Sequence, residues 1–370
     1  MINTIENTFT PHAAIHPGLN LKRELAEKDL KQNELAAEIG VMPSLLNEVI
    51  KGKRPITPDL SVLLGAALDC SSNKYNDLQS KYNLDLLLID NSIKEKVEAI
   101  KNWRELKEYV PVSYFRKEDV LIGEPRADIK QILKILGLKS VQEAPSALGS
   151  TKAAGILFKK SGKLFEHTAY VNSWLLYTKY LAGQQSVANF DFDSKQEMLD
   201  NLKSLFQKKD VLDKLPVLLA KYGIKVVIKG KPDHAPLDGA AYWDKENPVI
   251  GLTIRHKRFD NLLFTVYHEL AHIYLHLRKD KDASFVDSLE DLRIVDQKEE
   301  EANNFARNAI IPNSEWANFT LGRVDFSDDV IRLFANRLSI PGASVWWRLC
   351  FEGYLKYSGY SVHRNNNHIP

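Results

Sequence analysis

Two histidines stand four positions apart, at His268 and His272, within the stretch TVYHELAHIYLH of residues 265–276. Residues four apart on an α-helix lie on one face, so both imidazoles can reach a single metal ion. Glu269 directly follows the first histidine, where its carboxylate can take a proton from a water molecule. This H-E-x-x-H pattern predicts a helix that supplies two zinc ligands and a general base.

The residues around this pattern indicate that its helix is buried rather than solvent-exposed. Two ordinary histidines on a buried helix are the alternative interpretation, and the spacing together with the adjacent glutamate favours zinc. Tyr274 and His276, one turn past the pattern, could face the cleft, and His234 could polarise a carbonyl oxygen, but an ordinary structural role is favoured for all three and none is assigned to catalysis. The apolar positions that support burial are Leu262, Leu263, Val266, Leu270 and Ile273.

A catalytic zinc usually takes a third protein ligand, and three glutamates begin the downstream segment EEEANNFARNAIIP of residues 299–312. At about 100° per residue, Glu299 falls near the edge of the apolar face of that helix. Glu300 points away from this face, and Glu301 lies about 100° from its centre, so both are interpreted as solvated charges. Glu299 is therefore the predicted third ligand. The apolar face consists of Ala302, Phe305, Ala306, Ala309 and Ile310.

The stretch PVIGLTIRHKRFDNLLFTVYHELAHIYLH, followed by EEEANNFARNAIIP, resembles the ImmA/IrrE metallopeptidase family, a gluzincin-type group. The resemblance covers about residues 195–350. It implies a zincin-like domain with a short antiparallel sheet packed on helices. It also implies that His268, His272 and Glu299 bind Zn²⁺ and that Glu269 is the catalytic base, in agreement with the choice of Glu299 from helical geometry.

A second motif precedes this region. Residues 32–39 and 43–50 have the apolar periodicity of two short helices, and Gly40 stands where the turn between them needs positive φ. The sequence TPD at residues 57–59 is typical of a following helix start, with Thr57 as the N-cap. The pattern predicts a helix-turn-helix, and a plain helical bundle is the alternative.

In a helix-turn-helix the second helix lies in the major groove of DNA. Its early outward residues, Ser44 and Asn47, are predicted to meet base edges. The Asn47 side-chain amide can form two hydrogen bonds with one adenine, one through its NH₂ and one through its oxygen. Lys51, Lys53 and Arg54 are predicted to contact phosphates. Residues 1–90 carry nine lysines and arginines against twelve aspartates and glutamates, so DNA affinity must come from this local charge.

Three short motifs in residues 12–90 stand where the HigA-type antitoxins have them: HPG at 16–18, QNELA at 32–36 and GKRPITP at 52–58. The stretch resembles that family, which shares the XRE, lambda-repressor-like helix-turn-helix. The resemblance implies a homodimer that binds operator DNA, represses transcription and is often paired with a toxin.

We expect a mainly α protein with a small α+β domain. The predicted parts are the helix-turn-helix bundle at 12–90, a helical connecting segment at 91–194, the zincin-like domain at 195–350 and a polar tail at 351–370. The segment 91–194 offers no catalytic motif. Only Cys70 and Cys350 are present, no apolar run approaches the roughly 20 residues of a membrane span, and the first residues lack a secretion signal. A cytoplasmic protein without membrane contact is expected.

Two functions remain open on these grounds. In the first, a DNA-binding repressor or antitoxin carries a zinc metallopeptidase that cleaves the chain itself or a partner protein, such as a toxin or another repressor. In the second, the zinc domain is not catalytic and only binds a toxin or senses a signal. An intact Glu269 permits hydrolysis without requiring it.

Overall fold

The computed structural model describes residues 12–149, 164–208, 210–233, 235, 237–287, 297–365 and 368–369. The chain divides into two compact units, Met1–Lys101 and Asn102–Pro370. Helices dominate both, and a single small sheet lies in the described part of the second, as the sequence predicts. Among the described residues, none of the helices has both the length and the apolar character that crossing a bilayer requires.

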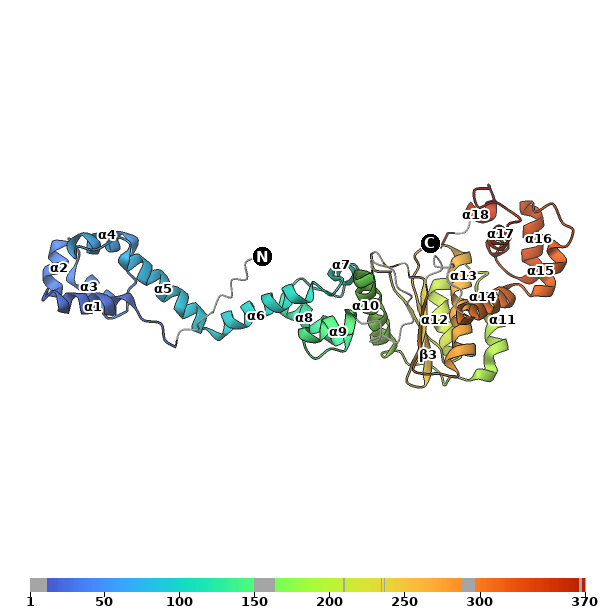
Figure 1. The fold of residues 1–370 in the computed structure, drawn as a ribbon, viewed down its shortest axis with the longest axis horizontal. Helices are drawn as coiled ribbons and strands as arrows, with labels where there is room; N and C mark the ends of the chain where they lie inside the picture. The colour runs from blue at the N-terminus through green and yellow to red at the C-terminus, as the bar shows by residue number, and fades with distance from the viewer. Residues whose placement is uncertain are drawn as a thin grey trace. The chain divides into compact units, whose positions relative to one another are not determined.

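The first unit is a helical bundle that closes around one apolar core (Figure 1). Buried leucines from its helices, such as Leu21, Leu46 and Leu64, fill the centre. The described helices are α1 (Pro17–Glu27), α2 (Gln32–Glu38), α3 (Pro43–Ile50), α4 (Pro58–Ala67) and α5 (Lys74–Ile89), and α6 (Asn91–Leu106) begins in this unit.

Local sequence signals set the ends of these helices. Gly40 adopts φ +70° between α2 and α3, a conformation that costs glycine little. Thr57 caps α4, because its hydroxyl oxygen accepts a hydrogen bond from the Leu60 amide at 3.3 Å. Pro43 and Pro58 stand in the first turns of α3 and α4, where a missing amide hydrogen leaves no bond unmade. The predicted helix-turn-helix is therefore formed with the predicted starts.

In the second unit one group of helices precedes the first strand of the sheet, and the other follows the third strand, with the fourth strand between two of its helices. The earlier elements are α7 (Val112–Lys117), α8 (Pro125–Leu136), η1 (Val141–Glu143), α9 (Ala144–Gly149), α10 (Leu164–Ala182), η2 (Phe192–Ser194), α11 (Lys195–Leu205) and α12 (Val211–Lys221). The later ones are α13 (Phe259–Ala271), η3 (His272–Leu277), α14 (Gln297–Ile310), α15 (Asn313–Thr320), α16 (Asp328–Leu338), α17 (Gly342–Phe351) and α18 (Val362–Asn365).

The sheet has the order β1-β3-β2-β4 in the described residues. Its strands are β1 (Lys225–Ile228), β2 (Gly239–Asp244), β3 (Asn247–Leu252) and β4 (Ser284–Asp287). Strands β2, β3 and β4 pair antiparallel as expected, but β1 runs parallel to β3, so the sheet is mixed and not wholly antiparallel. The β2–β3 hairpin packs beside β1 through β3, its second strand. Because β3 runs in the same direction as β1, this pairing is parallel.

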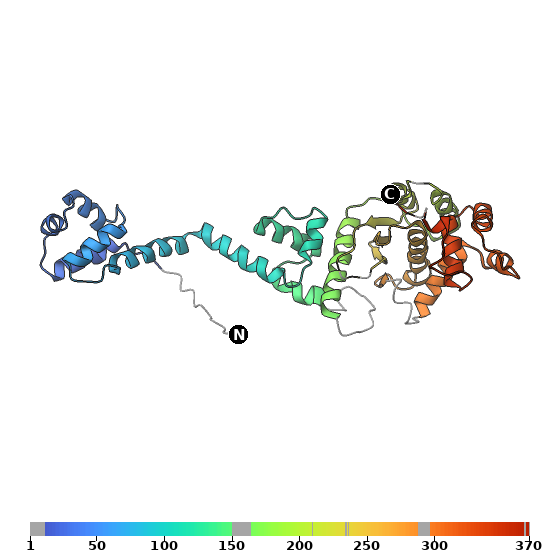
Figure 2. The ribbon, with the colours of Figure 1, turned by 90° about the horizontal axis from the view of Figure 1, so that it is seen from above.

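Both faces of the sheet are buried. Alternate residues of a strand point to opposite faces, and Val226 accordingly belongs to one core while Val227 belongs to the other. Helix α10 covers the face of Val227, and α11, α12 and α13 cover the face of Val226, so the sheet lies between two helical layers (Figures 1 and 2). Burial on both faces explains why the strands read as continuous apolar runs.

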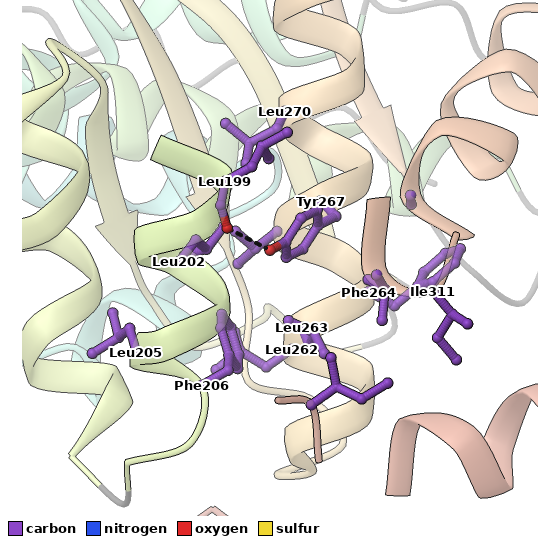
Figure 3. Close-up of a cluster of buried hydrophobic side chains, with 14 of the residues drawn as sticks. Leu199, Leu202, Leu205, Phe206, Leu262, Leu263, Phe264, Tyr267, Leu270 and Ile311 are labelled. Atoms are coloured by element: carbon purple, nitrogen blue, oxygen red, sulfur yellow. Dashed lines mark hydrogen bonds between the residues drawn. The ribbon is translucent and has the colours of Figure 1, made fainter. Parts of the chain in front are cut away.

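Helix α13 is the centre of the second layer and carries the H-E-x-x-H residues. Its side chains from Leu262 to Ala271 are buried, and α11 packs along it (Figure 3). The Tyr267 hydroxyl donates a hydrogen bond to the Leu199 carbonyl at 3.2 Å, which satisfies its buried polar atom. This packing fixes the rotation of α13 and therefore the direction in which its histidines point.

Candidate metal centre and DNA-binding surface

His268 and His272 lie at the end of α13 and the start of η3, where the helix widens into π geometry. Both side chains are buried, and their Nε2 atoms are 3.0 Å apart. π-helical turns are rare and are found frequently at functional sites. The two imidazole nitrogens therefore face one point next to the sheet.

Helix α14 brings Glu299 to the same point. Its Oε2 lies 3.3 Å from His268 Nε2, and its Oε1 lies 3.6 Å from His272 Nε2. The three ligand atoms all fall within 4.8 Å of one another. Tetrahedral zinc with bonds of about 2.0–2.2 Å needs ligand atoms about 3.3–3.5 Å apart. The observed distances of 3.0, 3.3 and 3.6 Å lie within about 0.3 Å of this range. The donor types also suit zinc, and of the predicted candidates Glu299 is the carboxylate that lies there.

The remaining ring nitrogens of both histidines also have partners. His268 Nδ1 lies 3.1 Å from Asn303 Oδ1, and His272 Nδ1 lies 2.9 Å from His276 Nδ1. The Phe285 ring of β4 stacks on His272 with centroids 4.4 Å apart and an interplanar angle of 14°. Metal-binding histidines commonly donate this second N–H to a fixed acceptor. The ring orientations are thus set by the protein itself.

His276 and Glu301, to which the sequence assigned no role at the metal site, take part in these contacts. His276 Nε2 lies 3.2 Å from Glu301 Oε2. Glu301 was predicted to be a solvated charge, and its side chain is indeed 46% exposed, but it also makes this contact. Burial lowers the pKa of His276, and hydrogen bonds from Gln297 and His276 lower the pKa of the Glu301 carboxyl. By contrast, Tyr274 packs against aromatic residues as expected, and His234 lies outside the described residues.

Glu269 is fully buried, and its carboxylate lies against the first residue of β2. A Cβ added to Gly239 would stand 2.1 Å from Glu269 Oε1 and 2.9 Å from the Cγ2 of Thr265. Glycine is therefore the residue that lets the strand approach this carboxylate. A buried carboxylate beside a histidine pair that fits a metal ion is suited to accepting a proton from water.

On the first unit, α3 presents the predicted DNA-contacting residues. Ser44 is exposed and Asn47 is half-buried, while Lys51 and Lys53 are exposed at the end of the helix. Arg54 is also exposed, but its Nε donates to Glu48 Oε2 at 3.0 Å. Such an exposed ion pair is weak, so Arg54 can exchange Glu48 for a phosphate.

These features define the class: a helix-turn-helix and a peptidase-like α+β unit with a candidate metal centre, joined in one chain. Residues 21–74 match the helix-turn-helix family model, and residues 220–341 match the model described as the IrrE N-terminal-like domain, peptidase family M78. These matches confirm the helix-turn-helix and the ImmA/IrrE-type domain that the sequence predicts. The chain thus joins a region that matches a helix-turn-helix family to a region that matches a peptidase family.

Among solved structures, the chain is similar to an addiction module antidote protein of a HigA family from Coxiella burnetii. The two sequences are 26% identical, the match covers 23% of this chain and 92% of that chain, and the TM-score is 0.22. No curated protein matches the chain.

Proposed function

We propose that this protein is a cytoplasmic transcriptional repressor of the antitoxin type, whose second unit is a zinc endopeptidase that cuts this chain or a partner protein. The proposal rests above all on the convergence of His268, His272 and Glu299 from two helices, beside the buried Glu269. The antitoxin part rests on the sequence motifs of residues 12–90, and a cognate toxin is the corresponding partner.

Each group in the site has a defined task in this proposal. Zinc held by the two histidines and Glu299 would act as a Lewis acid toward water and a peptide carbonyl. Glu269 takes one proton from the attacking water, the water oxygen bonds to the carbonyl carbon, and the C–N bond breaks. Glu269 then delivers its proton to the leaving amine. A cut between the DNA-binding unit and the second unit of a repressor would release the DNA-binding unit from the rest of the chain.

The direct test is the integrity of the purified full-length chain, alone and with a co-purified partner. We expect new fragments by intact mass spectrometry when zinc is present, none after chelation, and their return after zinc is restored. Unchanged masses under all three conditions would favour the alternative, a regulator whose zinc domain only binds a partner or senses a signal.

The DNA-binding part makes a separate prediction about base readout and charge. Asn47→Ala is expected to cost about 1–3 kcal/mol at one base position of the selected operator. Lys53→Ala is expected to weaken binding to all sequences and to reduce the salt slope of log K by about 1. Selection from random duplexes, followed by titration at several salt concentrations, measures both. Identical selected sequences for Asn47→Ala and the wild type would contradict the assignment of α3.

We further propose that the repressor binds DNA as a homodimer through α5 and the start of α6. Apolar side chains between 36% and 60% exposed gather on these helices, and such surfaces usually mark an interface. An antiparallel pairing centred on Ile93 would place Leu86 opposite the partner's Ile100, Ile89 opposite the partner's Val97 and Lys101 opposite the partner's Asp85. A second copy therefore complements both the apolar character and the charge. The exposed apolar residues are Leu84, Leu86, Leu87, Ile89, Val97 and Ile100.

Ile100→Glu is expected to weaken the dimer at least tenfold, because burying one such side chain contributes about 1.5–3 kcal/mol. Sedimentation equilibrium of the full-length chain measures the dissociation constant. Val324→Glu is the matched control, since Val324 is 97% exposed and lies in the second unit. A monomeric wild type, or equal dissociation constants for both variants, would refute this interface.

A further inference from the structure

A chain of side-chain contacts runs from the candidate metal centre to the protein surface. It starts at His272, passes through His276 four residues later, and ends at Glu301 of α14. The π geometry of η3 keeps His276 on the same side of the helix as His272, with ring centroids 5.0 Å apart. The first two members are buried, and the last is nearly half exposed.

The proton positions along this chain follow from the chemistry of a histidine ligand. If His272 binds a metal through Nε2, its only ring proton is on Nδ1. That N–H must donate to His276 Nδ1 at 2.9 Å, so His276 carries its own proton on Nε2. This second N–H donates to Glu301 Oε2 at 3.2 Å. Every donor in the chain thus meets one acceptor, and the chain ends on a carboxylate.

Glu301 is itself held in place. Gln297, one turn earlier on α14, donates from Nε2 to Glu301 Oε1 at 2.8 Å. Lys298 lies over the Phe285 ring, with its Nζ 5.2 Å from the ring centroid, and Phe285 in turn stacks on His272. Helix α14 therefore supplies the ligand Glu299 and also anchors the ring of His272. It does so through the Glu301 carboxylate, which contacts His276, which in turn contacts His272.

The other ligand histidine has a different arrangement. His268 Nδ1 lies 3.1 Å from the neutral amide oxygen of Asn303, whereas the contacts from His272 lead to the Glu301 carboxylate. An N–H that donates toward an anion makes the opposite ring nitrogen a stronger electron donor. The two histidines are therefore unequal, and His272 is the one whose electron-donating strength the protein increases.

We propose that His276 and Glu301 are positioning residues that hold His272 in its Nδ1-protonated tautomer and strengthen its bond to zinc. This inference depends on the proposed metal centre but not on peptidase activity. It assigns a role to two side chains that neither the H-E-x-x-H pattern nor the third ligand requires.

The test measures zinc affinity of the full-length protein by competition with a chromophoric chelator. Glu301→Gln keeps the size of the side chain and removes its charge at a half-exposed position, so folding should be little affected. We expect its zinc dissociation constant to rise about tenfold, at the lower end of the range for such outer partners. Glu300→Gln, one residue earlier and exposed, is the matched control and should leave the constant unchanged.

Variants of His276 distinguish positioning from simple packing. His276→Leu fills the space but accepts no hydrogen bond, and we expect about 10–100-fold weaker zinc binding. His276→Gln restores an acceptor for the His272 N–H and should recover part of the loss. The visible spectrum of the Co²⁺-loaded protein should shift in the leucine variant and return toward the wild type in the glutamine variant.

Two outcomes would overturn the proposal, and they differ in scope. Wild-type protein that binds no zinc would refute the metal centre and this chain of contacts together. Zinc-binding wild type with equal affinities for Glu301→Gln, Glu300→Gln and His276→Leu would refute the positioning role alone. If both His276 variants weakened binding equally, packing and not hydrogen bonding would be responsible, and the proposal would also fail.

Discussion

Full-length protein carrying Glu299→Ala is expected to purify without zinc, whereas the wild type retains close to one ion per chain. The carboxylate lies 3.3 Å and 3.6 Å from the two histidine nitrogens, and its removal leaves two ligands where zinc needs three from the protein. The loss should exceed the 10–100-fold effect of changing an outer partner. Elemental analysis of the purified protein measures it.

The neighbouring glutamate offers a control for this experiment. Glu300→Ala changes the same charge on the same helix, at an exposed position away from the histidines, and should keep the metal. The Glu299 side chain is itself 34% exposed, so its replacement should leave the thermal unfolding of the metal-free protein nearly unchanged. Equal zinc content in both variants would remove Glu299 from the ligand set.

Sequence alone was sufficient where a local rule determines the structure. The helix-turn-helix boundaries follow from Gly40, Thr57 and two prolines, because turns and caps depend on a few adjacent residues. The meeting of Glu299 with the histidines was predictable for a related reason: the apolar stripe of α14 determines which side of that helix faces the core.

Long-range pairings were less accessible. The strand β4, four residues long, has little periodicity of its own and is identified only by its pairing with β2. The parallel pairing of β1 with β3 depends on where a hairpin docks, which no residue in β1 encodes. Helix α10 lies in the segment 91–194 that was predicted to be helical, but its apolar residues do not reveal that their partner is the sheet.

The contact between His276 and Glu301 was missed although a signal existed. Three histidines at 268, 272 and 276 repeat every four residues, so one helix face carries all three. Helical geometry placed Glu301 about 100° from the apolar centre of α14, which is just beyond the edge of that face and not on the opposite side of the helix. Residues at such an edge reach a neighbouring helix, and Glu301 does so through its long side chain.

Replacing Glu269 by glutamine is expected to abolish cleavage and to leave both zinc content and DNA affinity unchanged. Glutamine has the same shape, so it fits against Gly239 and Thr265, but it cannot take a proton from water. General-base catalysis contributes about 10²–10⁴-fold to rate, and the loss should lie in this range. Fragments of the zinc-loaded chain, or of a degenerate peptide library, are quantified by mass spectrometry. Cleavage at the wild-type rate would remove Glu269 from the mechanism.

Gly239→Ala tests the position of the Glu269 carboxylate, because Gly239 lies on the strand that packs against it. The new Cβ would lie 2.1 Å from Glu269 Oε1, so the buried carboxylate must move while the three ligand residues keep their positions. We expect cleavage to fall strongly with zinc retained, as in the glutamine variant. Gly183→Ala is the control, because its Cβ would meet only carbonyl oxygens at 3.5 Å, an ordinary contact. Cleavage by Gly239→Ala equal to that of Gly183→Ala would mean that the position of Glu269 does not limit the reaction. Low activity of both Glu269→Gln and Gly239→Ala, with zinc still bound, would instead show that hydrolysis requires both the charge and the position of the Glu269 carboxylate.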